Sequence, residues 1–187
     1  MRKIQLIVLL LISAIFIQSC KKDVVTSAST TSDKELSANI NGTAWAPDTI
    51  AAAITYNAAL NTKSFTVQGT ADEKRININI TLANGTNTND FTLGNYKVDG
   101  TSRVQLTYST LELIGDTYGY KQVGEVEAGS GSVTITSIDP TKNVITGYYS
   151  FTAKKVNYDL NGNIESIEIS QILLGTFTNL PYTFSAN

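Results

Sequence analysis

The stretch "RININITLANGT", Arg75 to Thr86, alternates apolar and polar side chains with a period of two. This is the period of a β-strand with one face in a core. Its last part contains Asn84-Gly85, a strong signal for a tight hairpin turn. The two faces of the predicted strand carry Ile76, Ile78, Ile80 and Leu82 on one side, and Asn77, Asn79 and Thr81 on the other.

The same alternation recurs along the chain, in "SFTVQG" at 64–69, "RVQLTYS" at 103–109 and "SVTITSI" at 132–138. Turn signals separate the apolar runs, at Asn41-Gly42, Asp139-Pro140 and Asn161-Gly162, so consecutive strands are expected to pair as antiparallel hairpins. No segment after residue 35 shows helical spacing over three turns. The sequence therefore predicts an all-β domain, an antiparallel β-sandwich or flattened barrel of about nine or ten strands.

Bulky side chains occupy nearly every position expected to point inward, whereas a barrel that carries a ligand usually leaves small or polar residues there. We therefore predict a filled interior. Trp45, the single tryptophan, is expected to anchor the core or a sheet edge near the first hairpin. The inward positions are Phe65, Val67, Leu106, Tyr108, Val133, Ile135, Tyr149 and Phe151, together with the isoleucine face of the opening stretch.

The N-terminus has the layout of an export signal. Arg2 and Lys3 precede an apolar run, Ile4 to Ile17, that is shorter than the roughly 20 residues a membrane-spanning helix needs. "IQSC", residues 17–20, resembles the lipobox of bacterial lipoproteins, with Gln18 in place of a smaller residue. The resemblance implies that residues 1–19 are a signal peptide and that Cys20, the only cysteine, is lipidated.

Residues 20–35 are rich in Ser and Thr and have no apolar period, so we expect a lipidated cysteine and a flexible tether ahead of a single all-β domain at 36–187. The residue after Cys20 is not aspartate, which fits transfer to an outer membrane. Some lipoproteins of the Bacteroidetes type carry a lysine followed by two acids at this place, as a signal for export to the surface. This chain has only one acid, Asp23, so the periplasmic and the surface-exposed locations both stay open.

Composition excludes several functions. The chain has 14 Lys and Arg against 16 Asp and Glu, and loss of the signal peptide removes two of the basic residues. Phosphate binding needs a basic field, so nucleic acid is not an expected partner. The chain has no histidine, which excludes Ser-His-Asp and Cys-His catalytic systems and histidine metal sites. The sequence predicts no metal, no cofactor and no catalytic residue.

Two acidic motifs are candidate functional sites. Glu125 and Glu127 in "GEVEAG" would share one face of a strand, about 7 Å apart by strand rise. Glycosidase carboxyls must lie on opposite sides of a sugar, so a solvated strand edge is favoured.

The second motif is "DLNGNIE", which places Asp159, Asn161 and Asn163 at alternate positions, as in a calcium loop. An EF-hand needs glycine at its sixth position and a carboxylate at its twelfth, where this chain has Ile164 and Ser170. A looser calcium site that uses Asp159, Asn161 and Asn163 stays open, but a hairpin tip explains the same residues without a metal ion.

Tyrosines provide the only recognition surface that the sequence offers, because exposed tyrosines stack on sugars or bind protein partners. Packing within the sheets is the favoured role, since aromatic cross-strand pairs are ordinary stabilisers. Tyr148 and Tyr149 are expected on opposite faces of one strand. The others considered are Tyr118 and Tyr120, on a shared face, and Tyr96, Tyr108 and Tyr158.

Four segments, "NGTAW" at 41–45, "FTLGNYKV" at 91–98, "GSVTITSIDPTKNVITGYYSFTA" at 131–153 and "GTFTNLPY" at 175–182, occur in an order similar to a family of uncharacterised Bacteroidetes-type lipoproteins, a domain of unknown function. The resemblance implies an exported all-β lipoprotein and no known activity. "SQILLGTF" departs from it, because Leu173 and Leu174 stand where polar residues are expected.

Three functions compete on this basis. The first is an exported, lipid-anchored cell-envelope protein with a non-enzymatic binding or structural β-domain. It would contact the membrane through its lipid and have an envelope protein or a glycan as partner. The second is a calycin-like carrier of a small apolar ligand, although "NGTAW" has the wrong spacing for the lipocalin motif. The third is a glycan-processing enzyme, which the absence of histidine disfavours.

Overall fold

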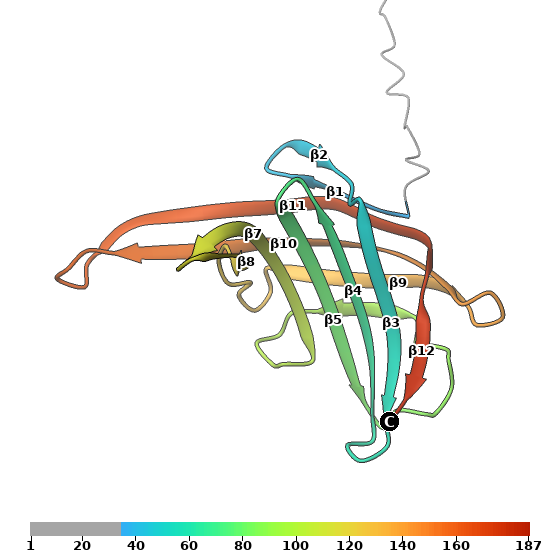
Figure 1. The fold of residues 1–187 in the computed structure, drawn as a ribbon. Coiled ribbons are helices and arrows are strands. Elements are labelled where there is room, and N and C mark those ends of the chain that lie inside the picture. The colour runs from blue at the N-terminus through green and yellow to red at the C-terminus, as the bar shows by residue number, and fades with distance from the viewer. Residues whose placement is uncertain (1–34) are drawn as a thin grey trace, which may run out of the picture. The chain divides into compact units, whose positions relative to one another are not determined.

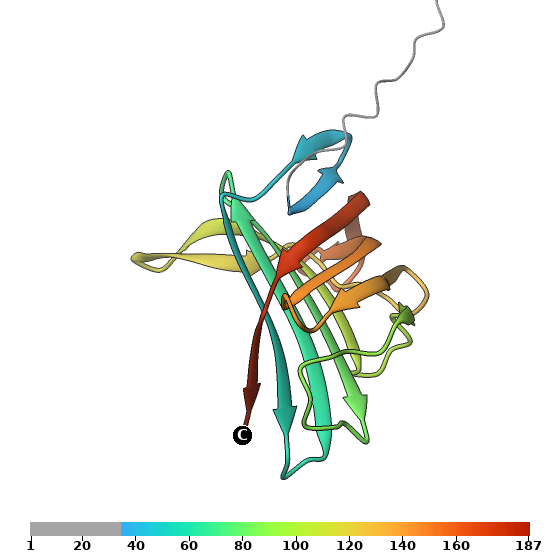
Figure 2. The same cartoon turned by 90° about the vertical axis from the view of Figure 1, so that its right-hand side faces the viewer.

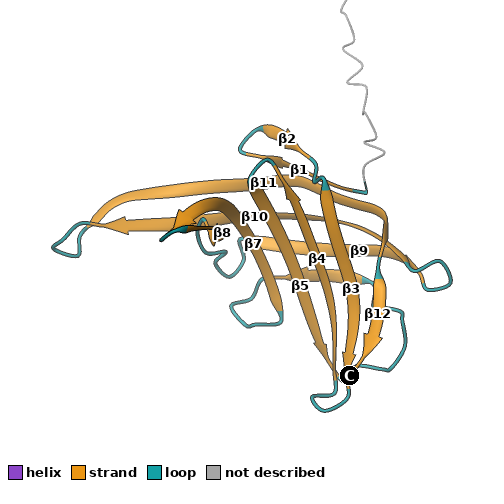
Figure 3. Cartoon of the chain, viewed as in Figure 1, coloured by secondary structure: helices purple, strands orange, loops and turns teal. Residues whose placement is uncertain are grey.

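Twelve β-strands and their connecting loops make up residues 35–187, the part of the chain that the computed structural model describes. No helix occurs among these residues (Figure 3). In this part of the chain, accordingly, no helix is long and apolar enough to cross a membrane. The predicted signal peptide at 1–19, Cys20 and the predicted tether as far as residue 34 lie outside the described residues.

The strands form two six-stranded sheets. The first sheet has the order β2 (Thr43–Trp45), β1 (Leu36–Ile40), β11 (Ile164–Pro181), β10 (Val144–Tyr158), β9 (Gly131–Asp139) and β6 (Gly94–Lys97). The second has the order β12 (Thr183–Ala186), β3 (Thr49–Asn57), β4 (Thr62–Ala71), β5 (Lys74–Ala83), β7 (Val104–Ile114) and β8 (Thr117–Gln122).

The strands of the two sheets cross steeply over a shared core (Figure 1). Each sheet keeps two edges, so the predicted all-β sandwich is confirmed and the barrel is not closed. The strand count exceeds the nine or ten expected because four short strands lie at the edges: β2, β6, β8 and β12. Short edge strands offer few unpaired backbone groups to other chains, which limits unwanted pairing.

The core follows the predicted alternation. Ile76, Ile78 and Ile80 are all buried, and so are the eight bulky residues predicted to point inward from the other strands. The ring of Phe65 packs against the rings of Phe91 and Phe177, with centroids 5.8 and 5.9 Å apart. Such tilted pairs add to the free energy gained from burial itself. Bulky side chains thus fill the space between the sheets, as predicted.

The hairpin predicted at Asn84-Gly85 is wrong, although the chain does turn there. Asn84 adopts a positive φ of 56°, but the chain then crosses to β6 in the opposite sheet, and β5 pairs with β4 and β7. A Cβ atom at Gly85 would lie 2.7 Å from the backbone nitrogen of Lys63. The glycine is therefore required by close packing against β4, and it does not mark a hairpin.

A buried lysine holds this crossing segment. Lys63 is only 4% exposed, and its Nζ donates to the hydroxyls of Thr86 and Thr88 and to the carboxylate and carbonyl of Asp90. The bond from Lys63, aided by one from Thr88, keeps the pKa of Asp90 below its usual range. A buried ammonium group is tolerated only when its donors are satisfied, so the loop and the lysine stabilise each other.

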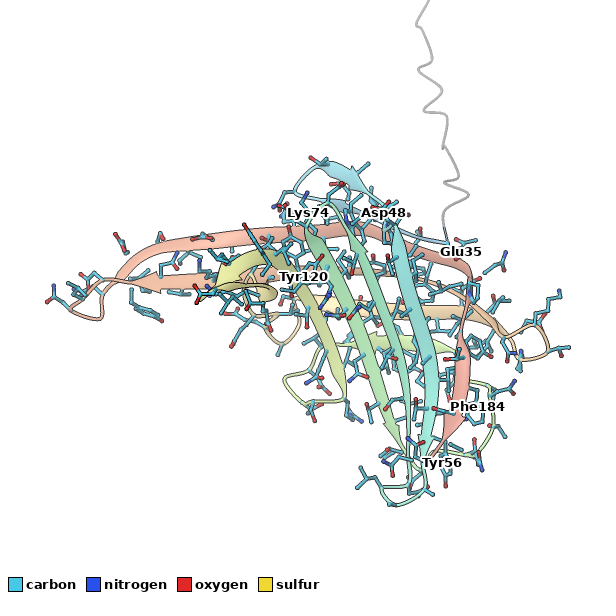
Figure 4. All side chains as sticks on the ribbon, viewed as in Figure 1. Glu35, Asp48, Tyr56, Lys74, Tyr120 and Phe184 are labelled. Carbon is cyan, nitrogen blue, oxygen red and sulfur yellow. The ribbon has the colours of Figure 1, made fainter. Side chains whose placement is uncertain are left out.

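Hairpins form at Asn41-Gly42, Asp139-Pro140 and Asn161-Gly162, as predicted. The expectation of antiparallel pairing between consecutive strands fails at the C-terminus, where β12 runs parallel to β3. One residue, Tyr182, separates β11 from β12, and the chain changes sheets there. The Tyr182 hydroxyl donates to the carbonyl of Asn89 and fixes this corner. Phe184 of β12 lies near the end of β3 that carries Tyr56 (Figure 4).

Two hairpins extend past the area where the sheets overlap. The β10–β11 hairpin is the longer one, and β7–β8 projects beside it (Figures 1 and 2). The extension of β10–β11 carries a polar network on its inner face, where Lys155 pairs with Glu168 and the Asn157 amide donates to Ser166 and Glu168. Most of its side chains are exposed, so the core ends near Ala153 and Ser170.

Candidate binding groove around Leu174

The outer faces of the two sheets differ in character. On β4 and β5 the outward side chains are polar, among them Thr66, Gln68 and Asn79. On β10 and β11 exposed apolar side chains lie on the outer face, including Tyr148 and Leu173. An exposed apolar cluster is more informative than a buried one, because large apolar patches on soluble domains often mark binding surfaces.

A β-bulge in β11 shapes this cluster. Tyr149 pairs with Gly175 and Phe151 pairs with Ile172. Between these two pairs β11 has one more residue than β10. The register with β1 shifts at the same place. The additional residue leaves both Leu173 and Leu174 exposed, the latter by 80%. Bulges of this kind redirect side chains and are common beside functional sites.

Leu174 adopts the left-handed backbone conformation, with φ of 51°. Seven other non-glycine residues in the described part of the chain have positive φ, and all are Asn, Asp or Glu. Asparagine and aspartate tolerate this conformation because their short polar side chains bond locally, whereas a bulky apolar residue there is a true outlier. Asn179, at a second register shift in β11, shows the residue type normally found in this conformation.

The bulge borders a groove of about 810 Å³, within the range of small-molecule sites. Gly175 lines the groove, and a Cβ atom there would lie 2.6 Å from the ring of Tyr149. The lining comes from β1, the β1–β2 turn, β10 and β11: Asn39, Gly42, Tyr148, Tyr149, Ser150, Gln171, Leu173, Leu174, Gly175 and Thr176.

The polar side chains of the groove differ in how they are hydrogen-bonded within the described part of the chain. Within residues 35–187, no protein group hydrogen-bonds to the side chains of Asn39, Gln171 and Ser150 or to the Tyr148 hydroxyl, and the bonds of Gln171 are made by its backbone. Thr176 differs, since its hydroxyl is bonded to Ser37 at 2.9 Å. Two side-chain amides, each with donor and acceptor atoms, therefore line the groove without hydrogen-bond partners among residues 35–187.

A second, smaller hollow adjoins the first. It is lined by residues of β1, β2 and the segment after β2, including Trp45 and Ala46, and it shares Asn39 and Leu174 with the first groove. Trp45 is buried on the edge strand and its indole nitrogen donates to the carbonyl of Ala71, which confirms its predicted anchoring role. Leu174 thus stands between two neighbouring hollows.

The acidic pair predicted in "GEVEAG" does not share a strand face. Glu125 makes only an isolated bridge with Lys154, and no regular strand spans 123–130. The carboxylate of Glu127 pairs with the Lys154 ammonium at 2.9 Å. Neither glutamate lines the groove. The prediction of one shared strand face was wrong, since the chain passes between sheets here.

The carboxylate of Asp159 is used within its own turn. It accepts bonds from the backbone nitrogens of Asn161 and Asn163 at 2.8 Å and from the Asn163 amide at 3.1 Å. The Asn163 side chain, followed by its backbone N–H, keeps the pKa of Asp159 below its usual range. Among residues 35–187 no cluster of three or more His, Cys, Asp and Glu side chains could hold a metal ion.

The tyrosines divide between packing and exposure. Tyr148 and Tyr149 take opposite faces, as predicted, with Tyr148 53% exposed and Tyr149 in the core. Burial raises the pKa of the Tyr149 hydroxyl, which donates to the carbonyl of Ser37. Tyr120 packs against Arg75, whose guanidinium carbon lies 3.7 Å from the ring centroid (Figure 4). The remaining predicted tyrosines lie apart from the groove: Tyr108 is buried, Tyr96 packs on Phe91, and Tyr118 and Tyr158 are exposed on the projecting hairpins.

Only one predicted recognition residue, Tyr148, is an exposed member of the groove. For the part of the groove that lies on β11, the sequence signal was the unexpected pair Leu173-Leu174 ahead of Gly175. Asn39 and Gln171 lie on strands that are not adjacent in sequence, and no local pattern places them together. Cys20, the predicted lipidation site, is outside the described residues.

The fold and groove define a β-sandwich domain with an open, uncharged hollow on one outer face. The chain belongs to the family described as Domain of unknown function (DUF6252), whose model matches residues 32–181. This match confirms the predicted membership of an uncharacterised domain family. No match was found among curated proteins or among solved structures.

Proposed function

We propose that this chain is an exported, lipid-anchored cell-envelope protein whose sandwich domain binds a ligand, without transforming it, in the groove around Leu174. One observation carries the binding role. The backbone of Leu174 is held in a left-handed conformation at the rim of a groove, and its apolar side chain is 80% exposed.

Strain of this kind needs a compensating reason. The left-handed conformation costs an ordinary L-residue roughly 1–2 kcal/mol, and an exposed leucine gains little from burial in return. Strained residues persist where the surrounding structure fixes them, and they cluster at functional sites. A contact with a ligand would make use of the raised apolar side chain.

The composition of the groove supports binding over catalysis. Its lining contains no Asp, Glu, Lys or Arg side chain, so it offers no carboxylate or ammonium for general acid–base chemistry. The bulky core supports a surface site over the alternative of a carrier that encloses an apolar ligand between the sheets. The proposal of export is supported by the short apolar run behind Arg2 and Lys3, and the proposal of lipidation at Cys20 by the resemblance of residues 17–20 to a lipobox.

The anchor is tested by labelling cells with a clickable palmitate analogue. The wild-type chain should take up the label and fractionate with membranes, and Cys20→Ala should lose both properties. Label or membrane association that persists in Cys20→Ala contradicts lipidation at this residue.

The groove is tested by titrating the purified full-length protein with phenol, acetamide and isopropanol while following backbone amide signals by NMR. The expected shifts cluster at residues 148–150 and 171–176. Leu174→Asn, which removes the apolar rim, should weaken the phenol response. Shifts that instead centre on the polar outer face around Asn79 contradict the proposed site.

A further inference from the structure

We propose that the ligand of this groove is a neutral oligosaccharide that packs on the Tyr148 ring and hydrogen-bonds to Asn39 and Gln171. This inference rests on the binding role proposed above and specifies the chemical class of the ligand. The observation behind it is one hollow that combines an exposed aromatic ring, two side-chain amides without partners in the described part of the chain, and a lining without charged side chains.

The charge distribution selects a neutral ligand. The nearest lysines of β10 are paired beyond the groove, Lys154 with Glu127 and Lys155 with Glu168. The groove itself contains no ionisable group except tyrosine hydroxyls. A charged ligand would lose its hydration without gaining an opposite charge, which is costly.

The unpartnered polar groups match hydroxyl chemistry. The side-chain amide of Asn39 and that of Gln171 each provide N–H donors and a carbonyl acceptor, and Ser150 adds a hydroxyl. Sugar hydroxyls also donate and accept, so neighbouring hydroxyls can satisfy both functions of one amide. A purely apolar ligand would instead cover these groups and leave their hydrogen-bonding capacity unsatisfied, which weakens binding.

Tyr148 supplies an apolar platform with a polar end. Its ring is 53% exposed at the groove. A pyranose ring presents C–H groups on its faces and hydroxyls around its rim, so a tyrosine below one face and amides at the rim complement it. Leu173 and Leu174, both exposed at the bulge, provide apolar contact at the side.

The adjoining hollow argues for a chain of sugars. Because the two hollows share Asn39 and Leu174, a ligand in the first can continue past Leu174 toward Ala44 and Ala46 of the second. A monosaccharide would fill only part of this path. We therefore expect affinity to rise with the number of sugar units until both hollows are filled.

The test titrates the full-length protein with a panel of neutral gluco-, manno-, galacto- and xylo-oligosaccharides, with oligogalacturonate as the charged comparison. Binding is followed by NMR and calorimetry. At least one neutral series should shift the amide signals of Tyr148, Ser150 and Leu174, with affinity that rises with chain length. Tyr148→Ala should weaken binding about tenfold or more, whereas Tyr148→Phe should keep most of it.

Tyr158→Ala is the matched control, because Tyr158 is an exposed tyrosine of the same strand outside the groove. It should bind like the wild type. Equal or tighter binding of oligogalacturonate overturns the neutral-ligand inference. If no sugar shifts the groove signals while phenol does, the groove remains a binding site and the sugar assignment fails. If neither phenol nor any sugar acts there, both proposals fail.

Discussion

Leu174→Asn should make the protein more stable, because asparagine tolerates the left-handed backbone that leucine resists. The side chain of Leu174 is mostly exposed, so its removal sacrifices little buried apolar surface. The backbone of the bulge is held on both sides, by β1 and by β10, and it has no reason to change. The substitution thus isolates the conformational cost of one residue.

The magnitude follows from that cost. Relief of roughly 1–2 kcal/mol of left-handed strain, less a few tenths for lost side-chain contact, leaves a gain of about 1 kcal/mol. For a chain of this size such a gain raises Tm by about 2–4 °C. Differential scanning calorimetry of the full-length protein measures it directly.

Asn179→Leu is the mirror experiment. Asn179 has nearly the same φ, 48°, is exposed and lies at the second register shift of β11. Its backbone nitrogen donates to the hydroxyl of Thr146, a bond that the substitution preserves. Leucine at this position should cost about 1 kcal/mol. A lower Tm for Leu174→Asn, with no loss for Asn179→Leu, would refute the idea that Leu174 is strained and would make it an ordinary structural residue.

Three further predictions concern the framework. Ile78→Ala should lower the free energy of unfolding, measured by chemical denaturation, by about 2–5 kcal/mol because it leaves a cavity, whereas Asn79→Ala on the solvated face should change it by less than about 0.5 kcal/mol. Similar costs for the two variants would mean that both faces of the strand are buried. Because Lys63 lowers the pKa of Asp90, the stability that this pair contributes is present above about pH 4 and is lost as the pH falls further. Asp90→Asn should therefore reduce the loss of stability at acid pH in a stability–pH curve, and an unchanged curve would contradict this. Gly175→Ala should lower Tm, at a cost of about 1–3 kcal/mol from overpacking, because its Cβ would meet the Tyr149 ring; an unchanged Tm would show that the ring moves freely.

The core was predictable from sequence because strand side chains alternate strictly. Once Ile78 is assigned to the core, the alternation also assigns to the core the residues two positions before and two positions after it. Lys63 was predictable by the same parity, since it shares a face with Phe65 and Val67. An inward lysine contradicts the expected composition of a core, and only the Thr86–Asp90 loop explains it.

The errors arose where local signals depend on distant partners. Asn84-Gly85 looks like a hairpin tip, but Gly85 is needed because it packs on the backbone of β4. The parallel pairing of β12 depends on the change of sheet at Tyr182, which leaves no periodic trace. In each case a contact between segments far apart in sequence decides the conformation of a short turn.

The groove was only partly visible in the sequence. Leu173 and Leu174 stood out as apolar residues in a polar place. Their exposure depends on a bulge whose register is set by β1 and β10 together. Asn39 lies on β1, far from these leucines in the sequence. The residue types in the sequence therefore indicate part of the site, but only the pairing of β1, β11 and β10 brings its residues together.

The most direct test of the groove as the ligand site is a phenol titration of the wild-type protein and of Leu174→Asn, followed at the amide signals of residues 148–150 and 171–176. Saturable shifts are expected at these residues in the wild type and much weaker ones in the variant, even though the variant is expected to be the more stable protein. Equal shifts in both proteins, or shifts centred elsewhere, would contradict it.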